Sequence, residues 1–132
     1  MMNRTSFLAA LALGMLATGC ATTAAPTASL AGTIWQIATI DGAPVAEGSM
    51  LSFTADSLSA SAGCNGLSGT YAVAGSTLTS GPLAATRMYC DGRMEHETAL
   101  GTLLQEGATI VLDGDRLALN GAGHRLQAVR QP

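Results

Sequence analysis

Turn-forming residues divide most of this chain into short pieces, and their spacing constrains the fold more than any other feature. From Leu30 onward, Gly, Ser, Asp and Asn recur every several residues. Such spacing is typical of short antiparallel strands joined by tight turns. The stretch of about one hundred residues has the size of one ordinary domain. We therefore predict a single compact β-rich domain over residues 30–132.

Apolar residues alternate with polar ones within these pieces. The predicted strands are Ile34–Ile40, Met50–Phe53, Leu58–Ala62, Gly69–Val73, Thr77–Thr79, Ile110–Leu112, Leu117–Leu119 and His124–Val129. Asp41-Gly42 and Asp113-Gly114 indicate turns, because these residue types tolerate a positive φ. The alternation is imperfect, so the pattern leaves the register of the strands undetermined.

The segment Arg93–Glu106 has a different period. Its apolar residues include Leu100, Leu103 and Leu104, a spacing that fits one face of a helix. Two glutamates fall near the first turn, where the helix dipole favours anions, and Gly107 follows as a C-terminal cap. One helix packed on a curved antiparallel sheet gives an α+β fold.

The first twenty residues indicate export. Arg4 precedes the apolar run Phe7–Ala17, which is shorter than the roughly 20 residues that span a bilayer. Small residues follow, as in a secretory signal peptide. The sequence Leu16-Ala17-Thr18-Gly19-Cys20 resembles a bacterial lipobox, although its Leu lies one place early. We predict a signal peptide over 1–19 and lipid on Cys20; the alternative is an ordinary cleaved signal with an incidental Cys.

Residues 20–29 read as a lipidated, flexible tether. They are rich in Ala and Thr, contain Pro26 and lack apolar periodicity. Two or three acyl chains on Cys20 would give stable membrane anchoring. Ala21 resembles the residue that follows the lipidated Cys in lipoproteins sorted to the outer membrane. The predicted location is therefore the outer membrane, with the domain facing the periplasm.

The charge of the chain argues against nucleic acids as partners. The chain has a formal net charge of -3, and all six of its basic residues are Arg. Five scattered Arg remain after the leader, too few to displace counterions from a nucleic acid. An acidic surface also gives no attraction to anionic lipid, so membrane contact is expected through the anchor alone.

Two further cysteines, Cys64 and Cys90, lie in the domain. In an oxidising compartment two thiols most economically form a disulfide. Free thiols or a metal or redox pair stay open as alternatives, although Cys-x-x-Cys spacing is absent. A nucleophilic Cys64 would need His96 or His124 as a nearby base.

Four other residues are candidate contacts. Asn65 lies in a tight turn, where its side chain is expected to bond its own backbone. Arg87 would hold a carboxylate or phosphate, or else pair with Glu95, and Met88 follows it. Trp35 favours core packing, with ligand stacking as the alternative. No metal site, cofactor motif or catalytic constellation is evident, so we expect no enzyme and no cofactor.

Several segments recur together in one known family. They are Leu30-Ala31-Gly32-Thr33-Ile34-Trp35, Ile40-Asp41-Gly42, Gly63-Cys64-Asn65-Gly66-Leu67-Ser68-Gly69, Ala85-Thr86-Arg87-Met88-Tyr89-Cys90 and Glu97. In this order they resemble the META domain family over about 30–130. The resemblance implies a small antiparallel, partly open β-barrel with one helix, a paired Cys64 and Cys90, and no agreed catalytic residue.

The resemblance extends to bacterial heat-shock lipoproteins associated with novobiocin tolerance. It implies a non-enzymatic envelope lipoprotein that supports stress tolerance by binding an envelope protein or lipid. A second hypothesis comes from the similar architecture of secretin pilots: a lipid tail or amphipathic peptide would bind in the barrel opening. An unrecognised periplasmic enzyme is the third.

Overall fold

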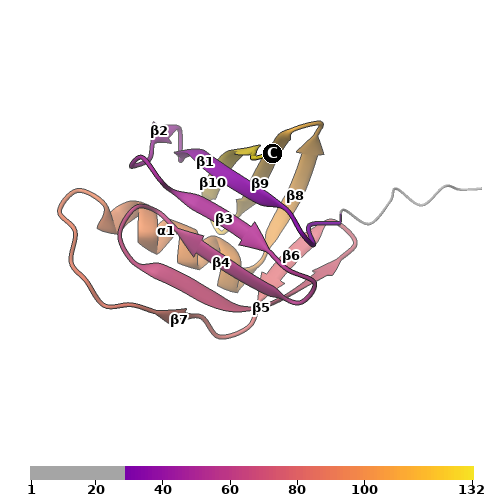
Figure 1. The fold of residues 1–132 in the computed structure, drawn as a ribbon, viewed down its shortest axis with the longest axis horizontal. Coiled ribbons are helices and arrows are strands. Elements are labelled where there is room, and N and C mark those ends of the chain that lie inside the picture. Colours follow the sequence, from indigo (N-terminus) through magenta and orange to yellow (C-terminus); the bar gives the residue numbers. More distant parts are fainter. Residues whose placement is uncertain (1–28) are drawn as a thin grey trace, which may run out of the picture.

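The computed structural model describes residues 29–132, so the predicted signal peptide, Cys20 and most of the tether lie outside the described part. The described chain forms ten strands and one helix (Figure 1). They are β1 (Ile34–Ile40), β2 (Ala43–Pro44), β3 (Met50–Phe53), β4 (Ser57–Ser61), β5 (Gly66–Ala74), β6 (Thr77–Ser80), β7 (Ala84–Ala85), α1 (Met94–Glu106), β8 (Ala108–Asp113), β9 (Arg116–Gly121) and β10 (His124–Arg130).

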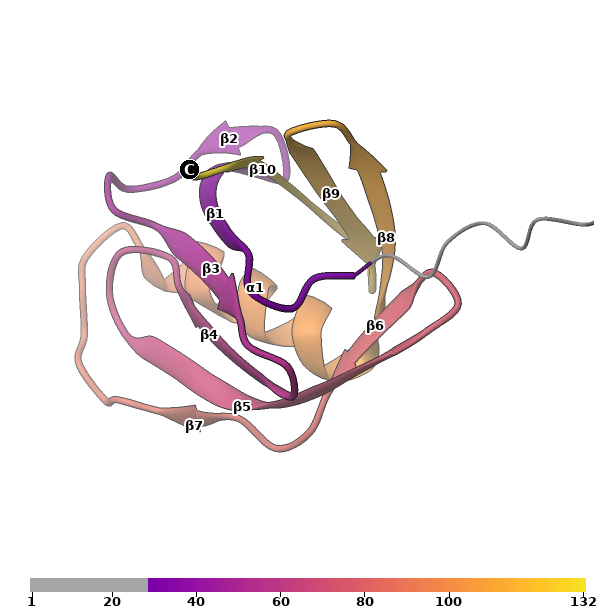
Figure 2. The same ribbon diagram turned by 45° about the vertical axis from the view of Figure 1, so that its right-hand side comes forward.

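Eight strands close into an antiparallel barrel. The order around the ring is β1-β3-β4-β5-β6-β8-β9-β10, and β10 pairs back with β1 (Figure 2). The predicted barrel with one helix is confirmed, but the partly open seam is not found. Five residue pairs join β1 to β10, with a bulge between Ile37 and Thr39. This pairing joins segments that are far apart in the sequence, so no local sequence pattern predicts it.

All eight predicted strands are present; β1 and β3 have the predicted bounds, and the other six have different bounds. The prediction Gly69–Val73 was too short, because β5 starts at Gly66, which pairs with Ser61 of β4. Glycines that suggested a turn here lie within a strand. The short strands β2 and β7 were not predicted, since each has only two residues and too little pattern to detect.

Side chains fill the interior of the barrel. Inward-facing residues of the strands and four residues of α1 form one core, including Trp35, Ile40, Leu51, Leu58, Leu78, Leu100, Leu103, Leu104, Leu117, Leu119 and Leu126. The helix crosses the barrel in Figure 2. Leu30, only 2% exposed, packs where the chain enters. Because side chains fill the interior, the structure does not support the hypothesis that a lipid tail or peptide binds in an opening of the barrel.

The strand directions give the barrel two distinct ends. At the end that we call the helix end, β1 finishes at Ile40, β10 begins at His124, and both lie beside α1. At the entry end, β1 begins at Ile34, and Gly32 donates a backbone hydrogen bond to Phe53. The first described residues therefore lie at the end opposite α1.

Adding a methyl group at two different glycines is expected to change the free energy of unfolding in opposite directions. A Cβ on Gly121 would overlap the backbone carbonyl of Gly107, which cannot move freely. We expect Gly121→Ala to lower the free energy of unfolding by about 2 kcal/mol. Gly101 in α1 has nothing within 4 Å of such a Cβ. Gly101→Ala should raise stability by about 0.5–1 kcal/mol, because alanine favours a helix. Urea unfolding of both variants checks this; equal effects would contradict it.

Candidate functional site

A buried amide at the helix end ties together three parts of the chain. Asn65 is 4% exposed. Its Nδ2 donates to the Met88 carbonyl (2.8 Å) and to Glu97 Oε2 (3.1 Å). Its Oδ1 accepts from Met88 N–H (2.7 Å) and the Thr86 hydroxyl (2.9 Å). All the hydrogen-bonding capacity of the amide is used. The predicted bond of Asn65 to its own backbone is therefore replaced by bonds to a distant loop.

A disulfide lies beside this amide. Cys64 and Cys90 are joined with a Cα–Cα distance of 5.8 Å. On the other side, the Arg93 guanidinium donates to the Gly63 carbonyl (2.7 Å). The loop 86–93 is thus fixed to the turn at 63–66 by covalent and polar links. In this state neither cysteine is a free thiol for nucleophilic attack or metal binding.

Three consecutive side chains of the same loop, those of residues 87–89, are exposed. Met88 is 58% exposed and Tyr89 is 79% exposed. Arg87 is exposed as well, and it forms no ion pair with Glu95 or any other residue within 29–132. The sequence thus singled out Asn65, Arg87 and Met88, and the structure brings them together. Tyr89 was missed as a candidate, although it adjoins Met88.

Trp35 lies away from this loop and is fully buried. Its Nε1 donates to the Thr33 hydroxyl (2.8 Å), and the Arg130 guanidinium lies over the ring at 4.8 Å from the centroid. Core packing is therefore its role. The alternative of ligand stacking on Trp35 is wrong, because no face of the ring is open.

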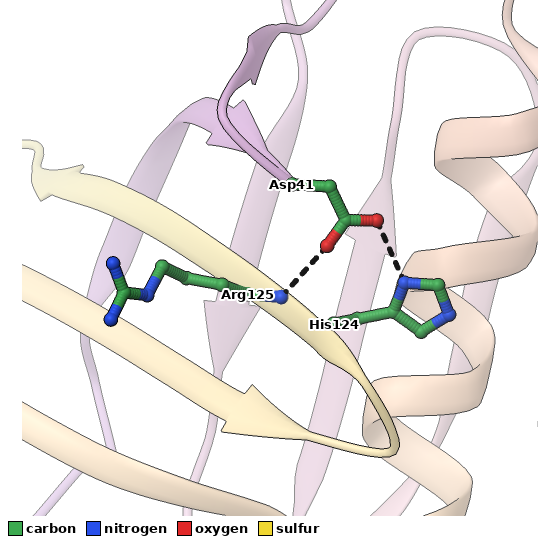
Figure 3. Close-up of polar contacts among 3 residues, drawn as sticks. All are labelled: Asp41, His124 and Arg125. Carbon is green, nitrogen blue, oxygen red and sulfur yellow. Dashed lines mark hydrogen bonds and ion pairs between the residues drawn. The ribbon is translucent and has the colours of Figure 1, made fainter.

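An acid–imidazole pair joins two turns at the helix end (Figure 3). His124 Nδ1 lies 2.7 Å from Asp41 Oδ2, and the Arg125 N–H donates to Asp41 Oδ1 (2.9 Å). The hydrogen bonds from His124 and then Arg125 lower the pKa of Asp41. The sequence indicated only a turn at Asp41, because its partners lie more than eighty residues away.

The pair borders a groove of about 530 Å³. Ile40 and Ala99 contribute to its floor, and the imidazole of His96 lines it together with His124. Both histidines of the chain therefore line the same groove, which their sequence spacing did not indicate. Among residues 29–132, no three His, Cys, Asp or Glu side chains are grouped to hold a metal ion.

The lowered pKa of Asp41 predicts acid sensitivity. Its folded pKa lies below the ordinary value of 3.8, so its hydrogen bonds stabilise the fold above that value and are lost as the pH falls below it. Asp41→Asn should cost less than about 1 kcal/mol at pH 6, because the carboxylate is 44% exposed. The difference from wild type should shrink below pH 4. A pH-independent difference in urea unfolding would contradict this assignment.

Comparisons with known proteins identify the family by a family model and the fold by two solved structures. The model of the META domain matches residues 28–132. One solved NMR structure has 27% identity and a TM-score of 0.69, covering 76% of this chain and 90% of that chain. Another, of a Burkholderia xenovorans protein, has 22% identity and a TM-score of 0.59, covering 77% and 83%.

A comparison with curated proteins found no match. None of the helices in the described residues has the length and apolar character needed to cross a membrane. The family match spans the whole barrel, including the turn of Asn65, the loop 86–93 and the Asp41–His124 pair. The chain belongs to the META domain family.

Proposed function

We propose that this protein is a non-enzymatic lipoprotein of the bacterial outer membrane, facing the periplasm. It supports stress or antibiotic tolerance by binding a partner protein through the helix end of its barrel. Membership of the META domain family, the lipobox-like segment ending at Cys20 and the fixed loop 86–93 support this proposal.

The observation that carries the proposal is the contrast between the two sides of the loop. On the inner side, Asn65 and the disulfide hold the backbone of Met88 and Cys90. On the outer side, Met88 and Tyr89 stay exposed to water. Tyr, Met and Arg are enriched in protein interfaces, and a loop held rigid loses little entropy on binding. The loop therefore has the properties of a preformed contact surface.

The position of this loop suits an anchored protein. The described chain starts at the entry end, whereas the loop lies at the helix end. A lipid on Cys20 would therefore hold the barrel from the side opposite its contact surface.

Labelling with palmitate tests the anchor: the wild type should be labelled and Cys20→Ala should not. An unlabelled wild type would remove the lipoprotein part of the proposal.

Photo-crosslinking in intact cells tests the partner. A benzoylphenylalanine at position 89 should give a discrete protein adduct, and the same group at Asp115, in a turn at the entry end, should give none. Met88→Ala with Arg87→Ala should reduce the adduct from position 89 at least fivefold while leaving the thermal unfolding unchanged, because all the altered side chains are exposed.

Loss of function provides the second readout. Cells carrying Met88→Ala and Tyr89→Ala should lose tolerance of heat or novobiocin to the same degree as a deletion strain. Full tolerance in those cells, together with absence of any adduct at position 89, would refute the proposed function.

A further inference from the structure

The groove beside the Asp41–His124 pair combines an apolar floor with an acidic rim. Ile40 and Ala99 lie buried beneath the groove, and its accessible apolar surface belongs to Met94, which is half-buried, and to Ala43, which is exposed. The carboxylates of Asp41 and Glu95 stand at the exposed rim. None of the five arginines in residues 29–132 lines this groove. The accessible apolar surface and the two carboxylates suit a ligand that has both an apolar part and a positive charge.

Most of the net negative charge of the domain lies on α1, the loop before it and the turn after β1. Residues 29–132 contain nine acidic residues and five arginines. The helix, the loop before it and the turn after β1 hold five of the acids and two of the arginines, namely Asp41, Asp91, Glu95, Glu97, Glu106, Arg87 and Arg93. This region therefore has a formal charge of -3 out of -4. Its field attracts cations and repels anionic segments.

We propose that the groove receives a lysine or arginine side chain of the partner protein. The aliphatic stem would lie on Ala43 and Met94, because such stems pack on apolar surface while the charged head stays near water. The inference rests on the proposed function, since it names the chemistry of the segment bound at the helix end.

The two carboxylates have room for the charged head. Each oxygen of Asp41 accepts one hydrogen bond, from His124 or Arg125, and retains a second lone pair. Glu95 makes no side-chain hydrogen bond to any residue in the described part of the chain. An ammonium or guanidinium therefore finds one fixed carboxylate and one free to move. A bare metal ion suits the groove less well, because no three ligands converge and the floor is apolar.

Blocked tripeptides provide a direct test on the full-length protein in detergent micelles. The probes are acetyl-Ala-X-Ala-amide with Lys, Arg, norleucine or Glu at X. In NMR spectra, the Lys and Arg probes should shift the amide signals of Met94, Glu95, Ala99 and His124 in a saturable way. Norleucine, which keeps the stem without the charge, should bind about fivefold more weakly or worse, and Glu should not bind.

Matched glutamate variants on α1 complete the test. Glu95→Gln should weaken the Lys probe about two- to fivefold, the range for one exposed charge pair. Glu106→Gln, on the same helix but outside the groove, should leave the affinity unchanged. Equal binding of Lys and norleucine, equal effects of both variants, or shifts outside the groove would overturn the proposal. So would a Zn²⁺ response at His96 and His124 without a Lys response.

These outcomes are separate from those of the proposed function. Crosslinking from position 89 reports the loop, and the tripeptides report the groove. Suppose that the adduct depends on Arg87 and Met88 but the groove does not respond to the Lys probe. Partner binding at the loop would then stand, and the inference that the groove receives a basic side chain would be wrong.

Discussion

Asn65→Ala is expected to lower the free energy of unfolding by about 3 kcal/mol. The substitution would leave the Met88 N–H and carbonyl, the Thr86 hydroxyl and the Glu97 carboxylate short of their partner. Each buried polar group that loses its hydrogen bond costs about 1–3 kcal/mol, and water entering the gap recovers part of the sum. The loss should exceed that of an ordinary surface amide several times over.

Urea unfolding followed by circular dichroism measures this effect, with Asn120→Ala as the matched control. Asn120 accepts one hydrogen bond, from the exposed Arg125 side chain, so its removal should cost less than about 0.5 kcal/mol. Amide exchange should also speed up at Met88 in Asn65→Ala alone. Similar stability losses in the two variants would show that the buried amide does not organise the loop.

Loss of the disulfide is the second large effect. The double variant Cys64→Ala with Cys90→Ala should be less stable than the wild type by about 3 kcal/mol, the entropic contribution of a cross-link enclosing about 25 residues. Reductant should destabilise the wild type by a similar amount and leave the double variant unaffected. A double variant as stable as the oxidised wild type would contradict this prediction.

The amide and the disulfide are expected to act together, because both hold loop 86–93 on the turn at 63–66. Once one link is gone, the loop is partly free and the other link orders less of it. The triple variant should therefore lose less stability than the separate losses added together, by about 1 kcal/mol. Strict additivity would mean that the two links stabilise different parts of the fold.

Local signals in the sequence were enough to predict α1, the eight strands of the barrel and part of the site. The leucine spacing predicted α1, and the Asp-Gly pairs predicted the turns after β1 and β8, because both depend on neighbouring residues. Asn65, Arg87 and Met88 were singled out from the residue types of two short segments, and they lie at one end of the barrel.

The closure of the ring and the groove depend on contacts between distant segments. Thr39 faces Gln127 across β1 and β10, and Asp41 meets His124, each pair separated by more than eighty residues. Neither pairing produces a periodic pattern in the sequence. The sequence of the turn at Asp41 would be the same whether or not an imidazole lies beside it in the fold. Core packing and ligand stacking both stayed open for Trp35 for the same reason. Alternation shows on which face of a strand a side chain lies, whereas its burial depends on the segments that cover that face.

The joining of the earliest strand to the final one has a consequence for biogenesis. During synthesis, β1 emerges long before β10, so the ring stays incomplete until nearly the whole domain has been made. Contacts so far apart along the chain also make folding slow. An exported chain of this design would reach its destination unfolded and would depend on holding factors until its last strand arrives. A truncated product lacking that strand would expose two bare edges, which invite aggregation.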